Sequence, residues 1–240
     1  WEEGFIPLSR NQVASDFLKI KTAGANTIRR YEPSIYDRNI FKEAMDKDLK
    51  IMYGFWFDPK TDFIKDERIL EAYEAKVLRN VRENLDEESI IAWNIGNETW
   101  GLLKKYYGQP YLTLVRREYV KFIEKLAQKI HEIDPNRPVL SSEEHDNIRL
   151  LGSIHDFKKY APSLDALGIN SYYDKNISQL DEIFQKENPE RPYIITEFGP
   201  KGYWNKELGD FWKDSLLIEL SSDIKGKSYK KQWESYIEPH

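Results

Sequence analysis

Short apolar runs rich in β-branched and aromatic residues recur along the chain, and each is followed by polar residues and then by a helical pattern. None of these runs alternates cleanly between apolar and polar positions, which is typical of strands covered on both faces. The six runs are Ala25–Tyr31, Lys50–Phe57, Ile90–Asn97, Pro138–Ser142, Leu167–Tyr173 and Tyr193–Phe198. The pattern therefore predicts six strands of a parallel sheet in an α/β protein.

Amphipathic patterns predict helices between the strands, and two of these helices have clear ends. The pattern from Ser15 to Ala23 stops at Gly24, a residue type that is common just after a helix. The longest pattern, Thr113–Ile133, stops two residues before Pro135. Further helices are predicted over Asp66–Leu85, from about Ile177 to Lys186, and from about Ser228 onward.

The spacing of the strands favours a barrel. The predicted strands end near residues 30, 57, 98, 142, 172 and 198, so one strand–helix unit takes about 34 residues. This length suits a (β/α)₈ TIM barrel or a doubly wound sheet. The chain contains neither the GxGxxG nor the GxxxxGK(S/T) phosphate fingerprint that many doubly wound nucleotide-binding proteins carry. We therefore expect the TIM barrel.

Composition and charge exclude several classes of protein. Of the 240 residues, 40% are hydrophobic and 14% are aromatic, which is too apolar for a disordered chain. No apolar run approaches the roughly 18 residues of a membrane span, so we expect no membrane. A net charge of -5 without a basic stripe argues against nucleic acid as a partner. The opening residues do not resemble a secretory signal, and the compartment stays open between secreted or periplasmic and cytoplasmic.

The titratable inventory predicts no metal or organic cofactor. The chain has no cysteine, so disulfides and thiolate metal sites are excluded. Its histidines are His131, His145, His155 and His240, and their spacing does not match a metal-ligand set. We expect structural or surface roles for them.

Two glutamates stand at the carboxyl ends of predicted strands, where TIM barrels build their active sites. Glu98 follows an apolar strand directly, and Glu197 lies at the end of the last predicted strand. They are three strand–helix units apart, which places them on opposite sides of the barrel mouth. A carboxyl pair across a cleft is what glycoside hydrolysis requires. Taken singly, each glutamate has a simpler explanation, because it can cap a helix or pair with an arginine.

The residues around both glutamates resemble the catalytic barrel of glycoside hydrolase family 2 and, more broadly, the clan A retaining glycosidases. Trp93–Glu98 (WNIGNE) is similar to the acid/base motif of that family, and Thr196–Gly199 (TEFG) is similar to its nucleophile motif. Asn26–Tyr31 (NTIRRY) resembles the segment that ends its second strand. The resemblance implies that Glu98 is the general acid/base and Glu197 the nucleophile of a double displacement.

Neighbouring polar residues are candidates for supporting roles. By the resemblance, Asn97 would bind the sugar 2-hydroxyl, whereas its simpler role is that of a turn residue. Arg30 or Arg29 would hold the nucleophile ionised; parity alone does not decide between them, and Arg30 is taken as the candidate. Tyr172 would donate to Glu197, with a packed aromatic as the alternative.

Further candidates would line the cleft and contact substrate. Exposed aromatic rings can stack on sugar faces, although packing explains each ring equally well. Glu143, with its two successors, would line the cleft or lie in a solvated loop. The aromatic candidates are Trp56 and Trp204, with Trp100 and Trp212 as further possibilities.

The sequence thus predicts a retaining glycosidase acting on an oligo- or polysaccharide. A transglycosylase with the same carboxyl pair and a catalytically silent carbohydrate-binding barrel are the alternatives. By the resemblance, the six strands correspond to the second through seventh of the barrel, so residues 1–240 would lack the first and eighth strands. We therefore expect a barrel that is incomplete at both ends and flanking domains in a longer chain. Specificity is expected to come from the loops after the strands, chiefly Asp58–Lys65, Thr99–Pro110 and Pro200–Gly226, with the last as the main candidate.

Overall fold

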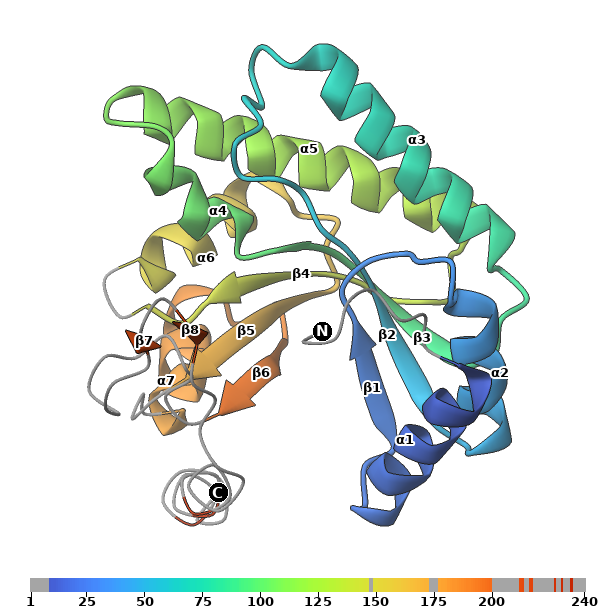
Figure 1. The fold of residues 1–240 in the computed structure, drawn as a ribbon. Helices are drawn as coiled ribbons and strands as arrows, with labels where there is room; N and C mark the ends of the chain where they lie inside the picture. Colours follow the sequence, from blue (N-terminus) through green and yellow to red (C-terminus); the bar gives the residue numbers. More distant parts are fainter. Residues whose placement is uncertain are drawn as a thin grey trace.

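A computed structural model describes residues 9–146, 149–172 and 177–199, together with residues 212–213, 216–217, 227, 230 and 234. Six parallel strands form one curved sheet in which neighbours along the chain are also neighbours in space (Figure 1). The strands are β1 Thr27–Arg30, β2 Lys50–Phe55, β3 Ile90–Asn97, β4 Val139–Glu144, β5 Ala166–Tyr172 and β6 Tyr193–Gly199. All six agree with the predicted runs to within two residues at each end.

Within the described residues, β1 and β6 are the edges of the parallel sheet, and the order is that of consecutive strands in a TIM barrel. The prediction of six barrel strands is therefore confirmed. A separate antiparallel pair joins β7 Trp212–Lys213 to β8 Leu216–Leu217. The predicted helix from Ser228 and most of the loop Pro200–Gly226 lie outside the described residues.

Helices connect the strands, and α3 and α5 lie side by side over the outer face of the sheet (Figure 1). The helices are α1 Arg10–Thr22, α2 Asp37–Asp46, α3 Glu67–Glu83, α4 Thr99–Leu102, α5 Tyr111–Ile133, α6 Leu150–Tyr160 and α7 Ser178–Glu187, with a 3₁₀ helix η1 over Leu103–Lys105. Helix α1 begins five residues before its predicted start, because Ser9 and Gln12 form a capping box.

Helices α2 and α6, and the four-residue α4, were not predicted from the sequence. Helix α2 is only ten residues long, and its buried apolar residues Ile40, Phe41 and Ala44 make a short pattern. Helix α6 contains a glycine and a serine, which have low helix propensity, and its buried Ile154 and Phe157 hold it on the sheet. For α2 and α6, packing against the sheet stabilises a helix that local propensity alone does not predict.

The main core lies between the sheet and its helices. Trp93 from β3 and Tyr53 from β2 are fully buried and meet edge to face with their ring centroids 5.8 Å apart. The indole nitrogen of Trp93 donates to Asp134 at the end of α5, at 2.9 Å. The strand residues of opposite parity make a separate small cluster on the other face of the sheet, with Ala92, Leu140 and Ala166 at its centre.

The curvature of the sheet brings its two edge strands together at their carboxyl ends. Arg29 on β1 forms an ion pair with Glu197 on β6, with 2.6 Å between Nη1 and Oε1. Both side chains are nearly buried, with exposed fractions of 10% and 13%. The carboxyl ends of β1 and β6 therefore come together at one polar cluster on the concave face of the sheet. The two predicted catalytic glutamates lie in this cluster.

Candidate active site

The turn from β3 into α4 presents Glu98. Two successive bends with positive φ make this turn, at Gly96 (92°) and at Glu98 itself (55°). Left-handed backbone is costly for a residue with a side chain, and such strain is concentrated at functional sites. The Glu98 amide donates to the Ser142 carbonyl at 2.8 Å, and its own carbonyl accepts from Leu102 at 2.9 Å. These bonds fix the position from which the carboxyl group projects.

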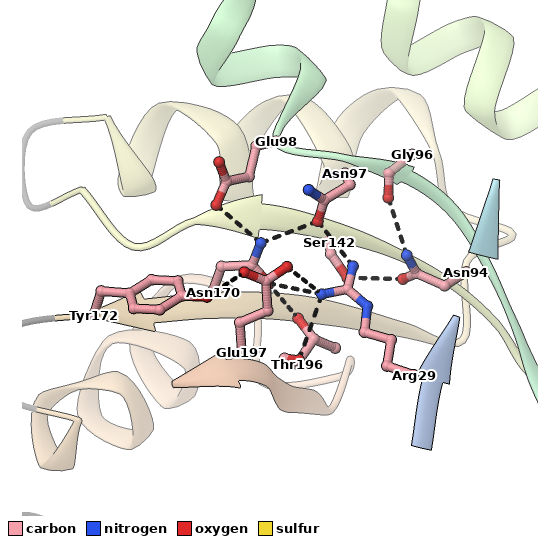
Figure 2. A network of polar contacts seen from close by, with 10 residues as sticks. All are labelled: Arg29, Asn94, Gly96, Asn97, Glu98, Ser142, Asn170, Tyr172, Thr196 and Glu197. Atoms are coloured by element: carbon pink, nitrogen blue, oxygen red, sulfur yellow. Dashed lines mark hydrogen bonds and ion pairs between the residues drawn. The ribbon is translucent and has the colours of Figure 1, made fainter. Parts of the chain in front are cut away.

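Glu197 faces Glu98 from β6 and is held by two donors (Figure 2). Arg29 donates to Oε1 at 2.6 Å, and the Tyr172 hydroxyl donates to Oε2 at 2.6 Å. The guanidinium charge balances the charge of a carboxylate at this position. The donation from Tyr172 agrees with the role expected from the sequence.

Asn170 on β5 connects the two glutamates (Figure 2). Its Nδ2 donates to Glu98 Oε1 at 2.9 Å and to Asn97 Oδ1 at 3.0 Å. Its Oδ1 accepts from Thr196 Oγ1 at 2.8 Å and from Arg29 Nη1 at 3.3 Å. Because Asn170 is only 2% exposed and bonded at both ends of its amide, it fixes the orientation of Glu98 relative to Arg29, the partner of Glu197.

A cavity of about 590 Å³ opens over this cluster. Its size suits a sugar unit with part of its leaving group. The lining residues are Tyr31, Asn97, Glu98, Leu102, Lys104, Lys105, Glu144, His145, Asn170, Tyr172 and Glu197. Both predicted catalytic glutamates thus line the same cavity.

Glu98 is in an environment that favours its protonated form. Burial, followed by the charges of Glu197 and Glu144, raises the pKa of Glu98 above its ordinary value, while the hydrogen bond from Asn170 and the charge of Arg29 oppose that shift. A carboxyl group that keeps its proton to higher pH can serve as a general acid.

The two tyrosines near Glu197 stay protonated over the whole physiological range. Burial and the neighbouring Glu197 carboxylate raise the pKa of Tyr31 to about 12 and move that of Tyr172 well above its usual value. Tyr172 is therefore a constant hydrogen-bond donor to the carboxylate. The ring of Tyr31 also lies 4.6 Å from the Arg29 guanidinium carbon, which is a cation–π distance.

The choice of Arg30 as the arginine of the site is wrong, because strand parity turns it away from the concave face. Arg30 donates to Asp37 at 2.8 Å, beneath helix α2, whereas Arg29 points toward Glu197. Successive residues of a strand face opposite sides of the sheet, so only one of the pair can reach the site.

The expectation that Glu143 lines the cleft is wrong for the same reason. Ser142 points inward and donates to Asn94 at 2.7 Å, so Glu143 points outward and is 2% exposed. The backbone amides of Trp100 and Gly101 and the charge of Arg116 oppose the effect of burial on the pKa of this carboxyl group. Burial raises the pKa of Glu143 well above the ordinary value, which favours a neutral carboxylic acid. Its successor Glu144 lines the cavity instead.

The aromatic candidates have different outcomes. Trp100 is buried, donates to Asp156 at 2.9 Å and lies under the Arg116 guanidinium, so it is not a sugar platform. Trp56 is 39% exposed but does not line the cavity, and its stacking role stays a prediction. Trp204 and the side chain of Trp212 lie outside the described residues.

Asn97 lies where the sequence placed it, between the site and the end of β3. Its Oδ1 accepts from Arg29 Nη2 at 2.8 Å and from Asn170. With the oxygen occupied twice, its Nδ2 is the atom that can donate into the cavity. Figure 2 shows this side chain between Glu98 and Arg29.

Several residues of the site were missed from the sequence. Asn170 and Thr196 are polar residues inside apolar strands, which is a usable signal, since buried polar groups in strands need partners. His145, which the sequence placed beside Glu143 at the cleft, does line the cavity; it is 5% exposed, and its Nδ1 lies 2.7 Å from Ser171 Oγ. Tyr31, Lys104 and Lys105 were not singled out, although the two lysines lie in the loop Thr99–Pro110 that was expected to shape specificity.

In the described part of the chain, no three His, Asp or Glu side chains are grouped so as to hold a metal ion. The helices of this part of the chain include none with the length and apolar character needed to cross a membrane.

Comparison with known families places the chain. The model of the glycosyl hydrolases family 2, TIM barrel domain, matches residues 39–215. The chain therefore belongs to glycosyl hydrolase family 2, and its strands and helices form part of that family's catalytic TIM barrel. The searched curated proteins include none that matches the sequence.

Solved structures agree on the fold. A β-glucuronidase from Bacteroides uniformis has a TM-score of 0.67 at 19% identity, over 96% of this chain and 26% of that one. A family 2 β-galacturonidase from Eisenbergiella tayi, bound to galacturonate, has a TM-score of 0.66 at 16% identity, over 95% and 38%. A β-glucuronidase from Bifidobacterium dentium gives 0.64 at 16%, over 93% and 34%. The chain thus spans only about a quarter to two fifths of the length of these proteins.

Proposed function

We propose that the chain carries the catalytic centre of a retaining glycoside hydrolase, with Glu98 as general acid/base and Glu197 as nucleophile. The observation that carries the proposal is the asymmetry of the two carboxyl groups. Glu98 is in surroundings that favour its protonated form, and Glu197 contacts a guanidinium and a phenolic donor across the same cavity. Two carboxyl groups in different protonation states are what acid-assisted nucleophilic displacement needs.

In the first step, a Glu197 oxygen attacks the anomeric carbon and forms a glycosyl ester. The bond from that carbon to the leaving oxygen breaks, and Glu98 gives its proton to this oxygen. In the second step, Glu98, now a carboxylate, takes a proton from water while the water oxygen attacks the anomeric carbon. The ester bond to Glu197 breaks, and both glutamates return to their starting forms.

The surrounding residues support these steps. Asn97 Nδ2 would donate to the sugar hydroxyl next to the anomeric carbon, an interaction that strengthens in the transition state. Arg29 and Tyr172 donate to different oxygens of Glu197, which orients the carboxylate and leaves lone pairs free for attack. Asn170 holds the acid and the nucleophile in one hydrogen-bonded network.

Two alternatives use the same residues differently. A transglycosylase would pass the sugar from Glu197 to a second sugar instead of water, and acceptor contacts decide between them. A silent carbohydrate-binding barrel would not require an acid with a raised pKa opposite a carboxylate paired with arginine. That arrangement favours catalysis over binding alone.

The identity of the sugar that the site binds is also part of the proposal. The similar structures are named for glucuronides and galacturonides, so aryl glycosides of uronic acids are the first substrates to test. At 16–19% identity these neighbours support the fold, and neutral glycosides belong in the same panel.

Trapping of the glycosyl enzyme tests the nucleophile. A 2-fluoro glycoside with a good leaving group should add one fluorosugar mass to Glu197, identified by peptide mass spectrometry. Glu197→Gln should lose both the label and turnover, and Glu190→Gln on the exposed surface should lose neither. A label on another residue, or inversion of the product anomer, would contradict the assignment.

Leaving-group dependence tests the acid. Glu98→Gln should lower kcat/KM by about 10²–10⁴-fold for glycosides with poor leaving groups, which need protonation. It should cost much less for a dinitrophenyl glycoside, which departs without a proton. Equal losses on both would contradict a role as general acid.

A further inference from the structure

The segment that follows Glu98 carries two lysines that form no ion pair with any described residue. Lys104 and Lys105 form most of η1, six and seven residues after Glu98, and both line the cavity. Every carboxylate described in the structure lies beyond ion-pair distance of their ammonium groups. In contrast, lysines that form ion pairs, such as Lys125 and Lys129 with Glu74, lie away from the cavity.

The backbone of this segment is held firmly, so the lysines are placed rather than loosely attached. Leu103 between the helices is fully buried, and its carbonyl accepts from Tyr106 and Tyr107, both at 3.0 Å. The carbonyl of Trp100 accepts from Arg116 Nε at 2.9 Å. A buried anchor immediately before both lysines keeps their stems at the rim of the cavity.

The negative charges of the cavity wall are already matched without these lysines. Glu197 is paired with Arg29, and Glu144 is paired with Arg149 at 2.9 Å. Arg149 also contacts Asp146, which does not line the cavity. Lys104 and Lys105 are therefore cations of the cavity lining that make no ion pair with the described carboxylates.

The position of the lysines identifies which part of a substrate they would meet. A general acid lies beside the glycosidic oxygen that it protonates, so the leaving group lies on the Glu98 side of the cavity. Lys104 and Lys105 belong to the chain segment that continues directly from Glu98. An anion on that side would be drawn to both ammonium groups, which act as point charges without a required planar geometry.

We propose that Lys104 and Lys105 form a subsite for an anionic group on the leaving portion of the substrate, a carboxylate or a sulfate. This inference rests on the proposed function, because the acid role of Glu98 defines the leaving-group side. It selects acidic oligosaccharides, or glycosides with an acidic aglycone, over neutral ones.

Matched substrates test the subsite on the full chain. The probes are 3-carboxyumbelliferyl glycosides and their ethyl esters, made with whichever sugar the unaltered chain hydrolyses, since the ester keeps the coumarin ring and removes the charge. Lys104→Ala/Lys105→Ala should lower kcat/KM about tenfold for the carboxylate and less than about twofold for the ester, because two exposed ion contacts contribute about 1.4 kcal/mol together. Added salt should shrink the difference.

Two further variants separate charge from structure. Lys104→Arg/Lys105→Arg should restore the preference for the carboxylate. Lys50→Ala/Lys159→Ala removes the same charge at exposed positions outside the cavity and should change neither substrate. Equal losses on both substrates would show that the lysines act on the fold or on Glu98, and unchanged kinetics on both would also overturn the subsite.

Affinity electrophoresis measures binding of anionic groups to the subsite and does not require turnover. Gels containing dextran, carboxymethyl dextran or dextran sulfate share one backbone and differ in charge. The unaltered chain and the Lys50→Ala/Lys159→Ala control should be retarded by one or both anionic polymers, and the Lys104→Ala/Lys105→Ala variant should not. The polymer that retards more identifies carboxylate or sulfate. Retardation without hydrolysis of any glycoside would contradict the catalytic proposal alone, and equal retardation of all variants, relative to their mobility in the dextran gel, would contradict the subsite.

Discussion

A single buried amide organises the chemistry at the scale of the residue. Asn170 donates to Glu98 and to Asn97, and accepts from Arg29 and from Thr196. The bond to Glu98 stabilises the ionised form of that carboxyl group, so Asn170 lowers a pKa that burial raises. The pKa of the acid is therefore a balance of opposing contributions, each of which can be removed separately.

Two substitutions should move the basic limb of the kcat/KM profile in opposite directions. Under the proposed mechanism, that limb reports the loss of the proton from Glu98 in the free enzyme. Asn170→Ala removes a bond to the charged form, so the pKa of Glu98 should rise and the limb should move to higher pH. Glu144→Gln removes a repelling charge, so the pKa should fall and the limb should move to lower pH.

Rate measurements across pH with one aryl glycoside would check both signs. Asn170→Ala should also lower kcat, because Glu98 loses its fixed orientation. Glu190→Gln, an exposed change, should leave the limb where it is. Shifts of the same sign in the two test variants would mean that another group controls the basic limb.

At the scale of the element, the turn from β3 into α4 is the most constrained part of the site. Gly96 has φ at 92°, and a methyl group built there would lie 2.3 Å from the Tyr119 hydroxyl oxygen. The following Glu98 adopts the left-handed region as well. The turn therefore needs glycine both for its backbone and for the close approach of α5.

Gly96→Ala should destabilise the fold by at least about 2 kcal/mol, from left-handed strain together with overpacking. Urea unfolding followed by tryptophan fluorescence would measure the change. Gly108→Ala is a matched control, because its φ is not left-handed and nothing lies within 4 Å of the added methyl. A cost for Gly96→Ala no larger than for Gly108→Ala would refute this account of the turn.

The elements that carry the site were predictable from sequence, but the direction of some side chains was not. Glu98 and Glu197 could be found because each ends an apolar run in a recognisable motif. Arg30 and Glu143 were misassigned because parity is known only once the register and the covering helices are known. The short helix α2, which supplies Asp37 to Arg30, had no strong sequence pattern.

At the scale of the whole molecule, the site joins strands that are far apart in the chain. Arg29 comes from β1, the acid from the end of β3, Asn170 from β5 and Glu197 from β6. Lys104 and Lys105 enter the same cavity from a connecting segment. Sequence could not predict that grouping, since it depends on how far the sheet curves.

Arg29→Ala should destabilise the molecule by about 3 kcal/mol, because it leaves a nearly buried carboxylate without its partner. Hydrogen exchange should rise in both β1 and β6, the strands that the ion pair connects. Arg30→Ala breaks a local pair with Asp37 and should raise exchange around β1 and α2 alone. Protection of β6 that is unchanged by Arg29→Ala would show that the edges are held together by other contacts.

The ion pair between Arg29 and Glu197 also has a consequence for how the chain acquires activity. Its partners are 168 residues apart, so it is among the most non-local contacts of the fold. Contacts of such long sequence separation carry a large loop-closure entropy and form after the local strand–helix units. We therefore expect weakening of this pair to accelerate unfolding more than it slows folding. Recovery of glycoside cleavage would then mark the completion of refolding, later than the burial of Trp93 in the core.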